Sequence, residues 1–220
     1  MMAALLLMFV LIISVTMLQV KKQYEKSIIQ EAIMKEQQEK IDRIVGIRTD
    51  LIGELKLEFE GTNLGVSVDE QTGAIAFDSN VLFDYNKYAL KPSGKKFLKE
   101  FIPRYFNIIL DGDFKDYVSE IIIEGHTDTN GEYLFNLELS QKRALTVAKY
   151  CLGDSVDVSV EELELLRNIV TANGRSYSNP VYMSDGKTVN DEASRRVEFK
   201  FRLKDEDMIN EMMTILNADR

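Results

Sequence analysis

The first twenty residues of the chain carry no charged side chain, and most of them are strongly apolar. As an α-helix, Met1–Val20 would be about 30 Å long, which matches the hydrocarbon thickness of a bilayer. Ser14 and Thr16 are compatible with lipid because their hydroxyls can bond to the helix backbone. A buried core helix and a cleaved signal peptide are alternatives, but the basic start and small-residue cleavage site of a signal peptide are lacking. The pattern favours a transmembrane helix over residues 1–20.

The charges that flank this apolar run bear on its orientation. Lys21 and Lys22 follow the run, and no basic residue precedes it. Counted alone, these lysines place the C-terminal part of the chain in the cytoplasm. The sequence begins inside the apolar run, so we expect an upstream segment with a basic residue before Met1. Such a segment would hold the N-terminus inside and leave the C-terminal part outside.

The segment 21–60 has the composition of a helical stalk or linker. It is rich in Lys, Glu and Gln and contains no proline. Apolar residues recur at heptad spacing, with polar interruptions, along a seam that consists of Val20, Tyr24, Met34, Ile41, Val45, Ile52, Leu55 and Phe59. Two arrangements remain open: a parallel coiled-coil dimer, or a single amphipathic helix that packs on its own domain.

From residue 61 to residue 220 the pattern is that of one folded domain. Alternation and short apolar runs predict strands, and apolar residues at helical spacing predict helices. We expect strands at 64–68, 74–77, 81–83, 121–123, 169–171 and 197–201, and helices at 92–109, 133–152 and 205–216. Pro103 should kink or split the first of these helices. This order predicts an α/β sandwich, with helices packed on a small mixed sheet.

Charge and rare residues exclude several functions. The net charge of −9 argues against a nucleic-acid partner, which would require clustered basic residues. Cys151 is the single cysteine, so the chain can form neither an internal disulfide nor a thiolate metal cluster. His126 is the single histidine, and neither a second metal-binding histidine nor a serine-nucleophile motif accompanies it. We therefore predict no catalytic residue, no metal and no cofactor.

The densest group of polar residues is Glu124–Gly131, directly after the predicted buried strand. Glycine near a strand end lets the backbone approach a ligand closely. Asp128 lies in this loop, and Arg143 lies on the helix that follows. If both face one pocket, they could hold a zwitterion, since the carboxylate attracts an ammonium and the guanidinium binds a carboxylate. The alternative is an ordinary surface ion pair between the two side chains.

Two motifs in this region resemble those of a known family. The residues Ile123–Asp128, with Gly131, Asn136, Leu139–Ser140 and Arg143–Ala144, resemble the central motif of the OmpA-like peptidoglycan-binding domain. Glu192–Phe199 is similar to its closing motif, although Ser194 stands where the family usually has asparagine. The resemblance covers residues 81–201. It implies that diaminopimelate of a peptidoglycan stem peptide is bound by Asp128 and Arg143, with Thr127, Asn136, Arg195 and Arg196 as further binding residues.

The order of anchor, stalk and wall-binding domain resembles the MotB-like, membrane-anchored branch of this family. The long segments 111–118 and 156–167 are more similar to the subunits of Zorya antiphage systems than to flagellar stators. The resemblance implies a chain that crosses the inner membrane once, with its C-terminal domain on the wall side and a proton-carrying aspartate just before Met1. A homodimer is predicted from the heptad seam. The resemblance also implies a MotA-like channel partner in an ion-driven motor. The alternative function is a passive tether between membrane and wall, with no ion-channel role.

Overall fold

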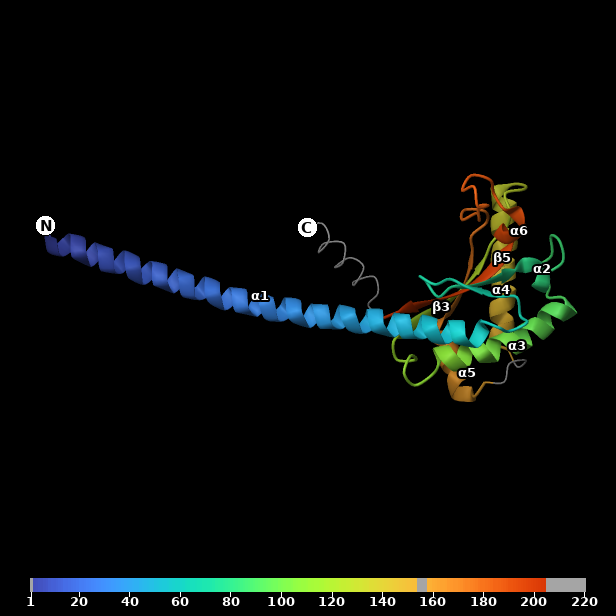
Figure 1. The fold of residues 1–220 in the computed structure, drawn as a ribbon, viewed down its shortest axis with the longest axis horizontal. Helices are drawn as coiled ribbons and strands as arrows, with labels where there is room; N and C mark the ends of the chain where they lie inside the picture. Colours follow the sequence, from blue (N-terminus) through green and yellow to red (C-terminus); the bar gives the residue numbers. More distant parts are fainter. Residues whose placement is uncertain (1, 154–157, 205–220) are drawn as a thin grey trace. The chain divides into compact units, whose positions relative to one another are not determined.

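The computed structural model describes residues 2–153 and 158–204. The chain divides into two compact units, Met1–Gly46 and Ile47–Arg220 (Figure 1). The helix predicted at 205–216 lies outside the described residues.

The first unit consists of the N-terminal part of helix α1 (Met2–Phe59). Near the N-terminus this helix is long and apolar enough to cross a membrane. The Ser14 hydroxyl donates to the carbonyl of Val10 at 2.9 Å, and the Thr16 hydroxyl donates to that of Ile12 at 3.0 Å. Both hydroxyls therefore bond to the helix backbone, as the sequence predicts for a helix in lipid.

The last turns of α1 belong to the second unit and contribute to its core. Leu51 and Leu55 are fully buried, and the Phe59 ring lies 5.1 Å from the ring of Phe101. Outside this core, Glu58 accepts a hydrogen bond from Arg104 at 2.6 Å. From Ile47 to Phe59, the seam of apolar residues thus packs on the chain's own domain, which is the second of the two arrangements left open.

The second unit is built on one mixed, five-stranded sheet. Its strands are β1 (Ser67–Val68), β2 (Ile75–Asp78), β3 (Val118–Gly125), β4 (Val170–Gly174) and β5 (Arg196–Leu203). They lie in the order β1-β2-β5-β3-β4, and only the β3–β4 pair is parallel. Together with the helices, this sheet confirms the predicted α/β sandwich.

One face of the sheet carries the core. Phe199 on β5 pairs with Ile75 on β2 and with Ile123 on β3, so these side chains share a face. Helix α3 (Pro92–Ile109) covers this face near β5, where the Phe101 and Phe199 rings are 5.0 Å apart. The opposite face carries charged residues such as Glu198 and Lys200. In residues 47–153 and 158–204, the helices that cover the sheet pack on one face, so this part of the domain has two layers.

Helix α4 (Tyr133–Cys151) packs unusually close to the ends of β3 and β4. Gly125 and Gly174 are neighbours at these ends. A Cβ atom on Gly125 would lie 2.3 Å from the carbonyl oxygen of Ser140, and one on Gly174 would lie 2.5 Å from the backbone nitrogen of Gln141. Any side chain at either position would push α4 away from the sheet.

The Gln141 side chain also closes the outer edge of β4. Its amide nitrogen donates to the carbonyl of Ala172 at 3.0 Å, and its amide oxygen accepts from the backbone N–H of Gly174 at 2.7 Å. Arg175 N–H bonds in the opposite direction, to the Gly125 carbonyl of β3. Because backbone groups alternate in direction along a strand, the groups that Gln141 occupies face away from the sheet.

Some predicted elements differ from the structure. The strand predicted at 81–83 is wrong: Ser79–Leu82 forms the short helix α2, because the Asp78 carboxylate accepts from the N–H of Asn80 and caps its first turn. Pro103 does not split α3, which is helical throughout. The 156–167 segment contains the start of a helix that was not predicted, α5 (Val160–Ile169), which begins with a capping box of Ser159 and Glu162. A further short helix, α6 (Asp191–Ser194), precedes β5.

The packing of α1 predicts where an independent domain must begin. A fragment of residues 47–220 should unfold cooperatively in urea. A fragment of residues 61–220 lacks Leu51, Leu55 and Phe59, and each lost buried side chain typically costs about 2–5 kcal/mol. Their combined loss approaches the whole stability of a domain, about 5–15 kcal/mol, so the shorter fragment should lack a cooperative transition. Equal midpoints for the two fragments would contradict the core role of α1.

Candidate functional site

A small pocket lies between the loop that follows β3 and the helix α4. Its volume is about 160 Å³. It contains five of the six binding residues predicted from the sequence, namely Thr127, Asp128, Asn136, Arg143 and Arg195. These residues come from three separate parts of the chain, and we call the cavity the Asp128 pocket.

Asp128 is bound to Arg195 rather than to Arg143. An Oδ2 atom of Asp128 accepts from Nη1 of Arg195 at 2.7 Å, and Oδ1 accepts from the backbone N–H of Asn130 at 3.1 Å. The Asp128 side chain is only 11% exposed. The hydrogen bond that Arg195 donates to Asp128 raises the pKa of Arg195, although partial burial of this arginine opposes the shift. The simple Asp128–Arg143 ion pair considered from the sequence is therefore replaced by an Asp128–Arg195 pair.

Arg143 is held by backbone carbonyls. Its Nε donates to the carbonyl of Lys87 at 2.9 Å, and its Nη2 donates to that of Asp84 at 3.4 Å. The guanidinium also lies over the Phe83 ring, 5.2 Å from its centroid. Burial lowers the pKa of Arg143 and Asp128 opposes this effect, but a guanidinium remains charged in proteins. A fixed cation thus lines the same pocket as the Asp128 carboxylate.

Two neutral residues complete the polar wall. Asn136 donates from Nδ2 to the carbonyl of Asn130 at 2.8 Å and so fixes the loop that carries Asp128. The Thr127 hydroxyl is buried and has no hydrogen-bond partner among the described residues. A buried hydroxyl without a partner is costly, so Thr127 is available to a ligand that enters the pocket.

Several residues that line the pocket were not predicted from the sequence. Tyr85 and Asn86 lie on the turn after α2, Asn80 lies on α2 itself, and Phe135 lies on the first turn of α4. The sequence offers one signal for the turn, the polar stretch Asp84–Lys87 between apolar residues. The strand predicted at 81–83 obscured it.

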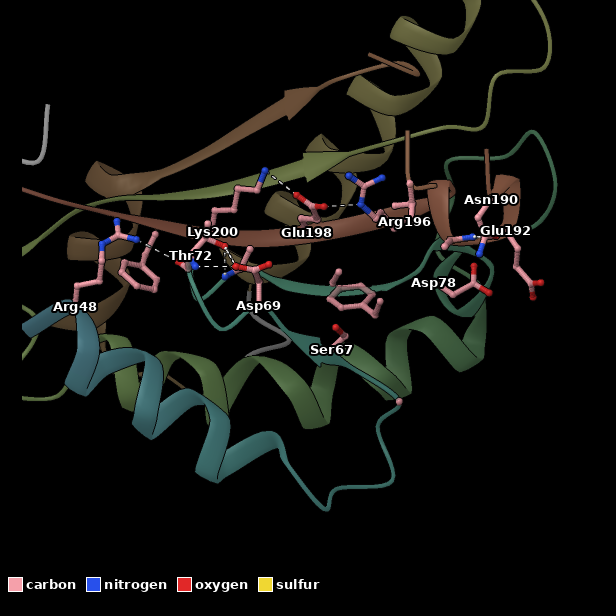
Figure 2. Close-up of a pocket in the computed structure, with 17 residues that line it drawn as sticks. Arg48, Ser67, Asp69, Thr72, Asp78, Asn190, Glu192, Arg196, Glu198 and Lys200 are labelled. Atoms are coloured by element: carbon pink, nitrogen blue, oxygen red, sulfur yellow. Dashed lines mark hydrogen bonds and ion pairs between the residues drawn. The ribbon is translucent and has the colours of Figure 1, made fainter. Parts of the chain in front are cut away.

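Arg196 and Ser194 do not line the Asp128 pocket. Arg196 lies in a larger groove of about 1010 Å³ across β2 and β5 rather than in the Asp128 pocket (Figure 2). There its Nε donates to Glu198, and its Nη1 donates to the carbonyl of Asn179 at 3.2 Å. Ser194 is fully buried, and its hydroxyl accepts from the backbone N–H of Val181 at 2.9 Å. The unusual serine therefore fixes the loop that borders the groove.

A buried ion cluster of Glu124, His126, Glu198 and Lys200 lies beside this groove. The Lys200 ammonium is 2.6 Å from Glu124 and 2.7 Å from Glu198, and His126 Nε2 is 3.5 Å from a carboxylate oxygen of each. Burial alone would raise the pKa of both carboxyls, but His126 and Lys200 outweigh burial. The pKa of Glu124 falls to about 2, and that of Glu198 is also lowered. Lys200 lies against both carboxylates, and Arg175 and Arg196 pair with Glu124 and Glu198 respectively, so these cations together balance the two negative charges.

Comparison with known proteins assigns the family. A model described as the OmpA family matches residues 82–194, about half of the chain. This chain belongs to the OmpA family. The matched region contains Thr127, Asp128, Asn136 and Arg143, and it ends one residue before Arg195.

The chain is also similar to individual proteins. The chain is 33% identical over 158 residues to the Zorya protein ZorB of Escherichia coli O139:H28, covering 69% of this chain and 61% of that protein. It is 31% identical over 140 residues to outer membrane protein A of Shimwellia blattae, covering 60% of this chain and 52% of that protein. The chain thus spans only part of the length of these relatives. A solved MotB-like protein from Desulfovibrio vulgaris is 22% identical, with a TM-score of 0.49 and coverage of 76% of this chain and 99% of that one.

The ion cluster makes stability dependent on pH. The pKa of Glu124 is lowered from 4.5 to about 2, so its contribution is complete above about pH 4.5 and is lost as the pH falls through about 2. Lys200→Met should move this loss to higher pH. At pH 7 the substitution should lower the free energy of unfolding by roughly 2–4 kcal/mol. This loss is at the low end of the range for breaking a buried ion pair, because the Lys200 side chain is 31% exposed. Urea unfolding of residues 47–220 between pH 2 and 7 measures both effects.

Arg202→Met is the matched control. Arg202 pairs with Glu120 at 2.9 Å on the same strand face, but its side chain is 48% exposed. Removal of such a surface pair should cost at most about 1 kcal/mol. If the Lys200 and Arg202 variants lose the same stability with the same pH profile, the ion cluster has no special role.

Proposed function

We propose that the Asp128 pocket binds the zwitterionic end of a diaminopimelate residue in a peptidoglycan stem peptide. The observation that carries this proposal is a buried anion and a buried cation lining one pocket of about 160 Å³. An amino-acid end group fits this volume and presents both an ammonium and a carboxylate. The chain's membership of the OmpA family supports the same ligand.

The Asp128 carboxylate can accept the ligand's ammonium even though Arg195 is already bound to it. An ionised carboxylate has about four acceptor sites on its two oxygens. Asn130 and Arg195 each occupy one of them. The remaining sites are open to an ammonium, and Arg195 orients the carboxylate that provides them.

Arg143 can bind the ligand's carboxylate with the donors that the protein does not use. A guanidinium has five N–H donors, of which the carbonyls of Lys87 and Asp84 take two. The other three can form charge-assisted hydrogen bonds to a carboxylate. Since the backbone already fixes the guanidinium, little conformational entropy is lost when the ligand binds.

We assign this site to binding rather than to catalysis. The polar side chains that line it are one carboxylate, two guanidiniums, amides and the hydroxyls of Thr127 and Tyr85. Each of the charged groups is held by a fixed partner, which suits recognition of a charged end group. The Thr127 hydroxyl would gain its missing hydrogen bond from the ligand.

For the whole protein, we propose a wall-anchoring, MotB-like subunit of an ion-driven motor with a MotA-like channel partner. The N-terminal apolar helix would cross the inner membrane once, and the second unit would lie on the wall side. The 33% identity to the Zorya protein ZorB favours this role over a passive tether. In this proposal the exposed part of the seam, which includes Tyr24 and Met34, forms the contact of a parallel dimer.

The wall-binding proposal predicts the behaviour of three pocket variants and one control variant. In sedimentation with purified peptidoglycan, the full chain in detergent should bind. Asp128→Asn removes the negative charge that attracts the ligand's ammonium, and Arg143→Lys removes the planar guanidinium that can bind a carboxylate with two parallel hydrogen bonds. Each variant should therefore bind at least about 30-fold more weakly. Thr127→Val should keep its stability and bind roughly two- to tenfold more weakly, because one hydrogen bond is lost. Glu120→Gln alters the ion pair with Arg202 on the charged face of the sheet and does not change the lining of the pocket, so this variant should bind as the parent does. Parent-like binding by folded Asp128 and Arg143 variants would reject the site.

The dimer proposal predicts crosslinks along the exposed seam. In a Cys151→Ser background in native membranes, Met34→Cys should form a disulfide between two chains. Glu36→Cys, two residues away and off the seam, is the matched control and should crosslink far less. Both side chains are exposed within a single chain, so access does not distinguish them. Equal crosslinking at the two positions, or none in folded protein, would contradict a seam-specific dimer.

A further inference from the structure

The size of the Asp128 pocket leaves most of any wall fragment outside it. Sites that enclose a small-molecule ligand usually measure about 300–1,000 Å³, whereas this pocket measures about 160 Å³. If it holds one amino-acid end group, as proposed above, the remaining peptide and the attached sugars must lie across its rim. The chemistry of the rim then decides which part of the wall is recognised.

Two large aromatic side chains stand on this rim and are unusually exposed. Tyr85 is 76% exposed and Phe135 is 53% exposed, yet both line the pocket. They come from different elements, the turn after α2 and the first turn of α4. Exposed aromatic rings on two elements at one pocket are typical of a binding surface.

The turn that carries Tyr85 is held rigidly. The Lys87 N–H donates to the carbonyl of Asp84 at 3.0 Å. The backbone carbonyls of Asp84 and Lys87 each also accept a hydrogen bond from the Arg143 guanidinium. Asn86 has a φ of 54°, a left-handed conformation that asparagine tolerates better than most residues. Backbone strain of this kind is often found where a ligand binds. Tyr85 is thus displayed on a preorganised turn, which reduces the entropy lost on binding.

The polar groups on the rim are neutral amides. Asn80, Asn86 and Asn130 all line the pocket. In the proposed function, Asp128 and Arg143 bind the zwitterion and Arg195 orients Asp128, so the charged groups already have partners. Amides both donate and accept hydrogen bonds, which suits hydroxyl and acetamido groups. Aromatic faces suit the apolar C–H face of a sugar ring. A rim of amides and aromatic rings therefore matches a sugar better than a charged peptide segment.

We propose that Tyr85 and Phe135 form a second subsite, which takes an N-acetylated amino sugar of the glycan strand attached to the bound stem peptide. This inference rests on the proposed function of the Asp128 pocket. It adds a requirement that the pocket alone does not impose, since the preferred ligand carries both a diaminopimelate end and a sugar. The turn at Asp84–Lys87 links the two subsites, because Arg143 holds its backbone.

The experiment compares three probes with the full chain in detergent micelles. The probes are a diaminopimelate-containing stem peptide, the same peptide on an N-acetylglucosamine–N-acetylmuramic acid disaccharide, and the disaccharide alone. Titration calorimetry should show that the parent protein binds the disaccharide-peptide roughly two- to tenfold more tightly than the peptide, a range set by aromatic stacking. Tyr85→Ala and Phe135→Ala should each lose this advantage, so that each variant binds the peptide and the disaccharide-peptide with equal affinity. Tyr85→Phe should retain it.

Tyr182→Ala is the matched control. Tyr182 is 51% exposed and does not line the pocket, so this variant should keep the parent's preference. Equal binding of the peptide and the disaccharide-peptide by the parent protein would overturn the sugar subsite and leave the wall-binding site intact. So would a Tyr85→Ala variant that weakens both probes equally, since that would indicate a peptide contact. If the parent protein binds none of the probes, the proposed function fails together with this inference.

Discussion

The close contact between α4 and the ends of β3 and β4 determines the geometry of the Asp128 pocket. Gly125 and Gly174 allow this contact because a Cβ atom on either would lie within 2.5 Å of the α4 backbone. Gly125 is followed directly by the loop that carries Asp128, and α4 carries Arg143. The separation between helix and sheet therefore also sets the separation between the anion and the cation. A larger residue at either glycine would alter both distances together.

Buried charges are compensated differently on the charged face of the sheet and in the Asp128 pocket. In the ion cluster, Lys200 lies against both Glu124 and Glu198, and the negative charge of this pair is balanced by residues of the protein. In the pocket, Arg195 balances Asp128, whereas the hydrogen bonds of Arg143 to the described residues go to two backbone carbonyls and leave three N–H donors unused. A buried cation with unused donors is a strong attractant for an anion. The cluster therefore stabilises the fold, whereas the pocket retains capacity for a ligand.

How much was predictable from the sequence depends on how far apart the relevant residues lie. The run Ile121–Ile123 and the periodic residues of α4 predict their elements because burial leaves a local pattern. The segment 81–83 does not predict its element, because three apolar residues fit a strand or a helical turn equally well. The hydrogen bond that caps the turn at Asp78 is what favours the helix. For α5, the capping box of Ser159 and Glu162 predicts the start of the helix, whereas the spacing of apolar residues alone does not. The partner of Asp128 was beyond sequence reasoning: Arg195 is 67 residues away, and spacing cannot rank two arginines.

The hydrogen bonds that Gln141 makes along β4 have a consequence for crowding. A strand at the edge of a sheet offers open backbone groups, on which a strand of another molecule can add. Here one side-chain amide occupies the outward groups of Ala172 and Gly174, and the opposite edge strand, β1, spans only Ser67–Val68. In the proposed function, many copies of this protein share one membrane plane, where their domains collide often. With both edges shortened or occupied, such collisions offer little template for aggregation through the sheet.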